Sequence, residues 1–142
     1  MTTLSNSNVV MDPLYIEGSE KIPTIDLDAE KGELTFRGRS IPENSREFYA
    51  PVLDWIDHYS LNPLPKTRFI IGLDYFNTSS SKCLLDVLRR AENLKNMGQT
   101  EVLVEWQYEE DDEDMLEAGK DYSAMVTLPF ELIEVPDYHK TE

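Results

Sequence analysis

Four hydroxyl side chains, those of Thr78, Ser79, Ser80 and Ser81, follow one another directly after Asn77. They join a run typical of a buried strand to a run typical of a helix. One such side chain is enough to cap a helix. The others would be exposed where free backbone N–H groups and the positive end of the helix dipole stabilise an added phosphate. The pattern therefore indicates a phosphorylation site, although an ordinary cap followed by a polar first turn is the simpler interpretation from these residues alone.

A run of six acidic residues at 109–114 is the second chemical candidate. Carboxylate oxygens bind Mg²⁺ and Ca²⁺, but the run lacks the glycine and the alternation of an EF-hand loop. Acidic residues at the start of a helix also stabilise its dipole, so a solvated helix start is favoured. A surface for a basic partner and a metal-assisted enzyme remain open as alternatives.

Other catalytic and cofactor-binding patterns are missing from the sequence. The two histidines, His58 and His139, and the single cysteine, Cys83, form no zinc-ligand spacing, no disulfide and no Ser-His-Asp arrangement. His58 suits a role as a dipole partner near a helix end, and Cys83 suits packing. Gly72 is isolated in its strand, so no glycine-rich phosphate loop is present. We predict no catalytic residue, no metal and no cofactor.

The charge of the chain restricts its partners. Its 142 residues include 28 acidic and 13 basic side chains, for a formal net charge of -15. Such a surface repels phosphate backbones and anionic membranes, so neither nucleic acid nor a membrane is expected as a partner. The polar amino-terminal residues lack a signal-peptide pattern. The lack of a signal-peptide pattern and the presence of a single cysteine together predict a cytoplasmic location.

The spacing of apolar and turn residues predicts an α/β fold with a mixed sheet. We expect one domain at 13–135 between flexible tails at 1–12 and 136–142. The predicted order, β-β-α-β-α-β-α-β, places a hairpin at 22–37, strands at 67–76, 101–108 and 128–133, and helices at about 44–59, 78–97 and 111–124.

Local signals refine two of these helices. Asn44 or Ser45 is expected to cap the first helix, and Pro51 to kink it or begin a second segment. Thr78 or Ser79 is expected to cap the second helix. Helical spacing further predicts that Phe48, Trp55 and Leu88 are core residues.

Several segments together resemble the SiaC family of bacterial regulatory phosphoproteins, over residues 23–133. The combination of PEN before the first helix with NTSS after an aromatic strand end is specific. The matching segments are 41–45 (IPENS), 48–49 (FY), 52–55 (VLDW), 75–82 (YFNTSSSK), 85–88 (LDVL), 104–108 (VEWQY) and 128–130 (LPF).

The resemblance implies a STAS-like fold, similar to anti-sigma-factor antagonists, and a phosphorylated threonine at Thr78. It implies a cognate serine/threonine kinase, a PP2C-like phosphatase, and a diguanylate cyclase that the unphosphorylated protein activates, which raises cyclic di-GMP and promotes biofilm or aggregation. An acidic binding module without phosphoregulation is the alternative. The residues expected to form the turn and the partner-binding surface are Tyr75, Asn77, Ser79, Ser80, Ser81 and Lys82.

Overall fold

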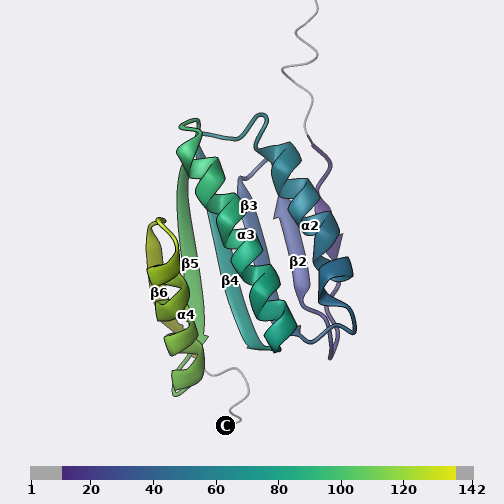
Figure 1. Ribbon diagram of the computed structural model, residues 1–142, viewed down its shortest axis with the longest axis vertical. Helices are drawn as coiled ribbons and strands as arrows, with labels where there is room; N and C mark the ends of the chain where they lie inside the picture. Colours follow the sequence, from purple (N-terminus) through teal and green to yellow (C-terminus); the bar gives the residue numbers. More distant parts are fainter. Residues whose placement is uncertain (1–10, 137–142) are drawn as a thin grey trace, which may run out of the picture.

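The computed structural model describes residues 11–136 and shows a single sheet with three helices on one face (Figure 1). This confirms the predicted α/β class. Along the chain the elements are β1 (Leu14–Ile16), β2 (Thr24–Asp28), β3 (Glu33–Ser40), α2 (Ser45–Tyr59), β4 (Lys66–Phe76), α3 (Thr78–Asn96), β5 (Glu101–Glu109), α4 (Glu113–Met125) and β6 (Phe130–Val135). No helix within residues 11–136 is long and apolar enough to cross a membrane.

The sheet is mixed, and its strands follow chain order from β1 to β6. β1, β2 and β3 pair antiparallel, whereas β3, β4, β5 and β6 pair in parallel. The carboxyl ends of the parallel strands therefore share one edge of the sheet, and the turn after β4 lies at that edge. We call it the carboxyl edge.

The amino-terminal strand β1 is absent from the predicted order. It has only three residues, which pair with β2 through Leu14 and Leu27 at one end and Ile16 and Ile25 at the other. Three residues are too few for an alternating pattern to be recognised. The predicted tails 1–12 and 136–142 fall largely outside the described residues.

Helix α2 begins at the predicted place but buries a partly different stripe. The side chain of Asn44 caps it by accepting a hydrogen bond from the Glu47 N–H at 3.1 Å. The helix runs on through Pro51, so the predicted second segment is wrong. Trp55 is buried as expected. Phe48 is only half-buried, because the neighbouring Tyr49 takes the inward position.

The core lies between the helices and the sheet, and Leu88 of α3 is fully buried in it. Replacing Leu88 by alanine is expected to lower the free energy of unfolding by about 2–5 kcal/mol, because a cavity is added to the lost burial. Chemical denaturation measures this. Leu61→Ala is the matched control, because that side chain is 76% exposed. Equal effects of the two substitutions would show that Leu88 does not lie on the buried face of α3.

Helix α4 approaches the sheet closely because it carries Gly119 where it crosses Trp106. A Cβ atom at Gly119 would lie 2.5 Å from Trp106 Cδ1 and 2.8 Å from Leu132 Cδ2. The Trp106 indole is fully buried and donates through Nε1 to the Met115 carbonyl of the same helix at 2.9 Å. The close contact between α4 and Trp106 therefore depends on the absence of a side chain at Gly119.

Candidate functional site

The hydroxyl turn lies at the carboxyl edge, where β4 ends and α3 begins. Its start is tied to the neighbouring strand, because the Asn77 N–H donates to the Ser40 carbonyl at 3.1 Å. Asn77 is also the helix cap, since its side-chain oxygen accepts from the Ser80 N–H at 2.8 Å. The prediction that Thr78 or Ser79 caps α3 is therefore wrong. The amide oxygen of Asn77, one residue before Thr78, accepts from a backbone N–H in the first turn of α3.

The four hydroxyls of the turn have four different environments. Thr78 is exposed, and its hydroxyl makes no hydrogen bond to another residue within 11–136. Ser79 is exposed but bonds to Ser45 at 2.8 Å and to Asn77 at 3.3 Å. Ser80 is fully buried. Ser81 donates back to the Thr78 carbonyl at 2.7 Å. Thr78 therefore has the most accessible hydroxyl of the four.

Ser80 belongs to a buried hydroxyl network that the sequence did not indicate. Its Oγ lies 2.8 Å from Ser40 Oγ and 3.2 Å from Ser45 Oγ, and Ser40 Oγ lies 2.7 Å from the Tyr49 hydroxyl. Burial raises the pKa of the Tyr49 phenol well above its usual value, so the group stays neutral. Ser40 ends β3 and Ser45 begins α2, so the network joins three elements beneath the turn and fixes its position.

Replacing Ser80 by alanine is expected to lower the free energy of unfolding by about 1–3 kcal/mol, because the buried hydroxyls of Ser40 and Ser45 each lose a partner. Ser79→Ala is the comparison. It is expected to cost less, because Ser79 is itself exposed and the Ser45 hydroxyl keeps its hydrogen bond to Ser80. Thermal or chemical denaturation of both variants tests this, and a larger loss for Ser79→Ala would contradict it.

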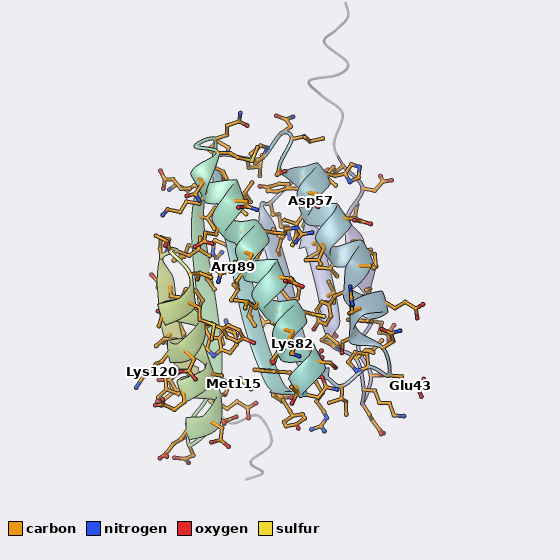
Figure 2. All side chains as sticks on the ribbon, in the orientation of Figure 1. Glu43, Asp57, Lys82, Arg89, Met115 and Lys120 are labelled. Atoms are coloured by element: carbon orange, nitrogen blue, oxygen red, sulfur yellow. The ribbon has the colours of Figure 1, made fainter. Side chains whose placement is uncertain are left out.

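Two other predicted site residues flank the turn on the surface. Tyr75 is half exposed, and the Arg39 guanidinium lies over its ring at 5.5 Å from the centroid. Lys82 is exposed one helical turn after Thr78, near the start of α3 (Figure 2). Residues four apart on a helix are neighbours. Tyr75, Thr78 and Lys82 are thus surface groups at the carboxyl edge, whereas Ser80 is part of the support beneath it.

A contact from α4 fixes the first turn of α3 from the other side. The Tyr122 hydroxyl donates to the Ser81 carbonyl at 2.7 Å, and burial raises the pKa of Tyr122 to about 12. Cys83, two residues after Ser81, is buried, and burial also raises the pKa of its thiol. The thiol therefore serves packing, as predicted.

The acidic run at 109–114 extends from the last residue of β5 through the connecting turn into the first turn of α4. Asp112 caps the helix by accepting from the Met115 N–H at 3.0 Å, and Glu113 and Asp114 occupy its first turn. This is the solvated helix start that the sequence favours. Within residues 11–136, no three His, Cys, Asp or Glu side chains are placed to hold a metal ion together.

Millimolar Ca²⁺ or Mg²⁺ is expected to leave the melting temperature nearly unchanged, because these carboxylates serve the helix start. A ligand that binds only the folded state stabilises it measurably at 100 times its Kd, by about 2.7 kcal/mol. Differential scanning fluorimetry with and without a chelator measures the effect. A large rise in the melting temperature that the chelator reverses would contradict this prediction and indicate a metal site.

Comparison with known protein families and sequences identifies relatives of the chain. The model of the family described as SiaC family regulatory phosphoprotein matches residues 16–135. An uncharacterized protein of Pseudomonas aeruginosa (strain UCBPP-PA14) is 31% identical over 120 residues, which are 84% of this chain and 94% of that protein.

Solved structures are similar over the same region. SiaC of Pseudomonas aeruginosa superposes with a TM-score of 0.81 at 29% identity, covering 88% of this chain and 100% of that one. The crystal structure of the diguanylate cyclase SiaD in complex with its activator SiaC, from the same organism, contains a chain that superposes with a TM-score of 0.80 at 30% identity. That match covers 86% of this chain and 99% of the other.

Proposed function

The chain belongs to the SiaC family of regulatory phosphoproteins, and from this premise we propose that it binds and activates a diguanylate cyclase, with Thr78 as the switch. The observation that carries the proposal is the environment of Thr78. Its hydroxyl is exposed and unbonded within the described residues, at the start of α3, whereas Ser79 and Ser80 are held by hydrogen bonds. The complex of SiaD with its activator SiaC supports the choice of partner class.

The regulator itself performs no chemistry in this proposal. A cognate kinase transfers the γ-phosphoryl group of ATP to Thr78 Oγ1, which loses its proton, and ADP leaves. A PP2C-like phosphatase hydrolyses the ester and releases inorganic phosphate. A cytoplasmic location supplies the ATP for the kinase and the GTP for the cyclase. Raised cyclic di-GMP, with biofilm or aggregation as the result, is the proposed output.

The physical effect of phosphorylation is local. A phosphothreonine carries about -1.5 to -2 charges at pH 7. Thr78 lies on a surface fixed from below by the hydroxyl network and from the side by Tyr122. These contacts hold the turn in place, so the backbone does not shift to carry the phosphate away from a docked partner. A partner docked over Thr78 must desolvate the new charge or lose its contact. The cyclase therefore binds only the unphosphorylated form of the chain.

The test uses SiaD of Pseudomonas aeruginosa as the probe. Purified unphosphorylated chain is added to SiaD, and cyclic di-GMP formed from GTP is followed by chromatography. We expect faster synthesis with the chain than without it, and a loss of this effect after stoichiometric phosphorylation. Binding without activation, or activation that phosphorylation leaves unchanged, would favour the acidic binding module without phosphoregulation.

A further inference from the structure

The hydroxyl of Ser45 holds the side chain of Ser79, which is the neighbour of Thr78 in the turn. Ser45 begins α2 and Ser79 lies in the first turn of α3, and the two helices lie side by side on one face of the sheet (Figure 1). Ser45 is 4% exposed, whereas Ser79 and Thr78 are both exposed. Exposure alone therefore does not decide which of the two hydroxyls a kinase modifies.

The single proton of the Ser79 hydroxyl points to Asn77. The Oδ1 atom of Asn77 accepts from the Ser80 N–H at 2.8 Å, which identifies it as the oxygen of the amide. An amide oxygen only accepts, so in the 3.3 Å contact between Ser79 Oγ and Asn77 Oδ1 the hydroxyl is the donor. Ser79 has no second proton, so in its 2.8 Å contact with Ser45 the Ser45 hydroxyl donates.

The same reasoning gives a direction to every bond of the hydroxyl network, because each hydroxyl has one proton to donate. Ser45 donates to Ser79, so Ser80 donates to Ser45 at 3.2 Å. Ser40 then donates to Ser80 at 2.8 Å, and the Tyr49 phenol donates to Ser40 at 2.7 Å. The chain of donors starts at a phenol whose pKa is raised by burial and ends at the cap of α3.

This direction matters for the chemistry of phosphorylation. A kinase needs a hydroxyl oxygen that can turn toward the γ-phosphorus of ATP and a proton that can pass to the kinase base. In Ser79 the oxygen accepts the Ser45 proton, and its own proton goes to Asn77, so the group is held toward α2 and the cap. The Thr78 hydroxyl has neither restraint within residues 11–136.

The bond from Ser45 is the stronger of the two that hold Ser79. Its length of 2.8 Å is the usual distance for an O–H···O bond, whereas the 3.3 Å contact with Asn77 is longer than usual. Without the Ser45 hydroxyl, only the weaker contact would keep the Ser79 side chain from turning outward.

We propose that Ser45 is a specificity-determining residue for phosphorylation of the turn, because its hydroxyl holds Ser79 back and leaves Thr78 as the acceptor. This inference rests on the kinase-controlled switch proposed above. Ser45 does not touch the phosphoryl group and acts through Ser79, so it is a positioning residue. When Ser45 is absent, Ser79 Oγ bonds to the γ-phosphorus of ATP, its proton passes to the kinase base, and ADP leaves.

The experiment compares variants incubated with the cognate kinase and ATP, with the phosphate located by mass spectrometry. Thr78→Ala is expected to be phosphorylated at Ser79 only at a background rate. Combining Thr78→Ala with Ser45→Ala is expected to raise the rate at Ser79 about tenfold or more, since tenfold corresponds to about 1.4 kcal/mol, a loss that one or two hydrogen bonds account for.

Ser40→Ala in the same Thr78→Ala background is the matched control. It also removes a fully buried hydroxyl from the network, but Ser40 makes no contact with Ser79. The rate at Ser79 is expected to stay within about twofold of that in Thr78→Ala alone, because the bond from Ser45 is kept. An effect of loosened packing alone would appear in both variants. Circular dichroism verifies that each variant is folded.

A second measurement needs no kinase. Three-bond NMR coupling constants between the Hα and Hβ protons of Ser79 report its χ1 rotamer. A single rotamer is expected in the wild type and in Ser40→Ala, and averaging over rotamers is expected in Ser45→Ala. This reports on the restraint itself, whatever preference the kinase has between serine and threonine.

The outcomes separate the role of Ser45 from the proposed function. Phosphorylation of the wild type at Thr78, with Ser79 equally unreactive and equally ordered with and without the Ser45 hydroxyl, would overturn the role of Ser45 and leave the switch standing. Rotamer averaging of Ser79 in the wild type would also overturn that role alone. Phosphorylation of the wild type at Ser79 instead of Thr78 would overturn both.

Discussion

Replacing Thr78 by alanine is expected to abolish phosphorylation of the chain while leaving its fold and its binding to the cyclase largely intact. Thr78 is exposed, its hydroxyl bonds to no other described residue, and Asn77 supplies the cap. Its removal therefore costs no internal hydrogen bond. Mass spectrometry after incubation with the cognate kinase measures the loss, and a pull-down measures binding.

Two further variants test the assignment of the switch. Ser79→Ala is the control, and it is expected to remain a kinase substrate, because its hydroxyl is already bonded to Ser45. Thr78→Asp is expected to weaken cyclase binding, though less than phosphate does, since one carboxylate supplies only part of the charge. Phosphate found only on Ser79 or Ser80 would refute the assignment.

Replacing Gly119 by alanine is expected to destabilise the fold by about 1–3 kcal/mol through overpacking. In an exposed helix the same change would stabilise by up to about 1 kcal/mol, because alanine has the higher helix propensity. Here the new methyl group meets the buried Trp106 ring at 2.5 Å, and any shift of the ring strains its bond to the Met115 carbonyl. The sign of the effect therefore tests the packing of α4.

The measurement is chemical denaturation followed by tryptophan fluorescence, which reports on the two buried tryptophans, Trp106 and Trp55. Lys120→Ala on the exposed side of α4 is the control, and it is expected to stay within about 0.5 kcal/mol of the wild type. A Gly119→Ala protein more stable than the wild type would show that α4 has room to move away from the sheet.

The elements that carry the site were predictable because their signals are local. The strand ending at Phe76 and the helix after it were recognised from apolar periodicity, and the observed α3 (Thr78–Asn96) nearly coincides with the prediction. The predicted cap, Thr78 or Ser79, lies one or two residues after the observed one, Asn77. Asparagine and the hydroxyl residues after it are all good caps, and only the backbone path shows which oxygen reaches the Ser80 N–H.

The support beneath the turn could not be predicted, because it joins residues distant in sequence. Ser40 and Ser80 are 40 residues apart, and Ser45 and Ser79 are 34 apart. Serines are common on surfaces, so nothing local marks these as buried. The parallel pairing of β3 with β4 brings them together. The same holds for Phe48 and Tyr49, whose order of burial depends on how α2 packs on the sheet.

The direction of the strands decides how this protein should be attached for binding measurements. All strands except β2 run the same way, since β1 and β3 are both antiparallel to β2 and the rest are parallel to β3. An affinity tag placed before residue 11 therefore enters at the end of the sheet away from Thr78. A tag placed after residue 136 leaves beside the carboxyl edge, where β6 ends. Immobilisation through the amino-terminal side keeps Thr78 open to the partner.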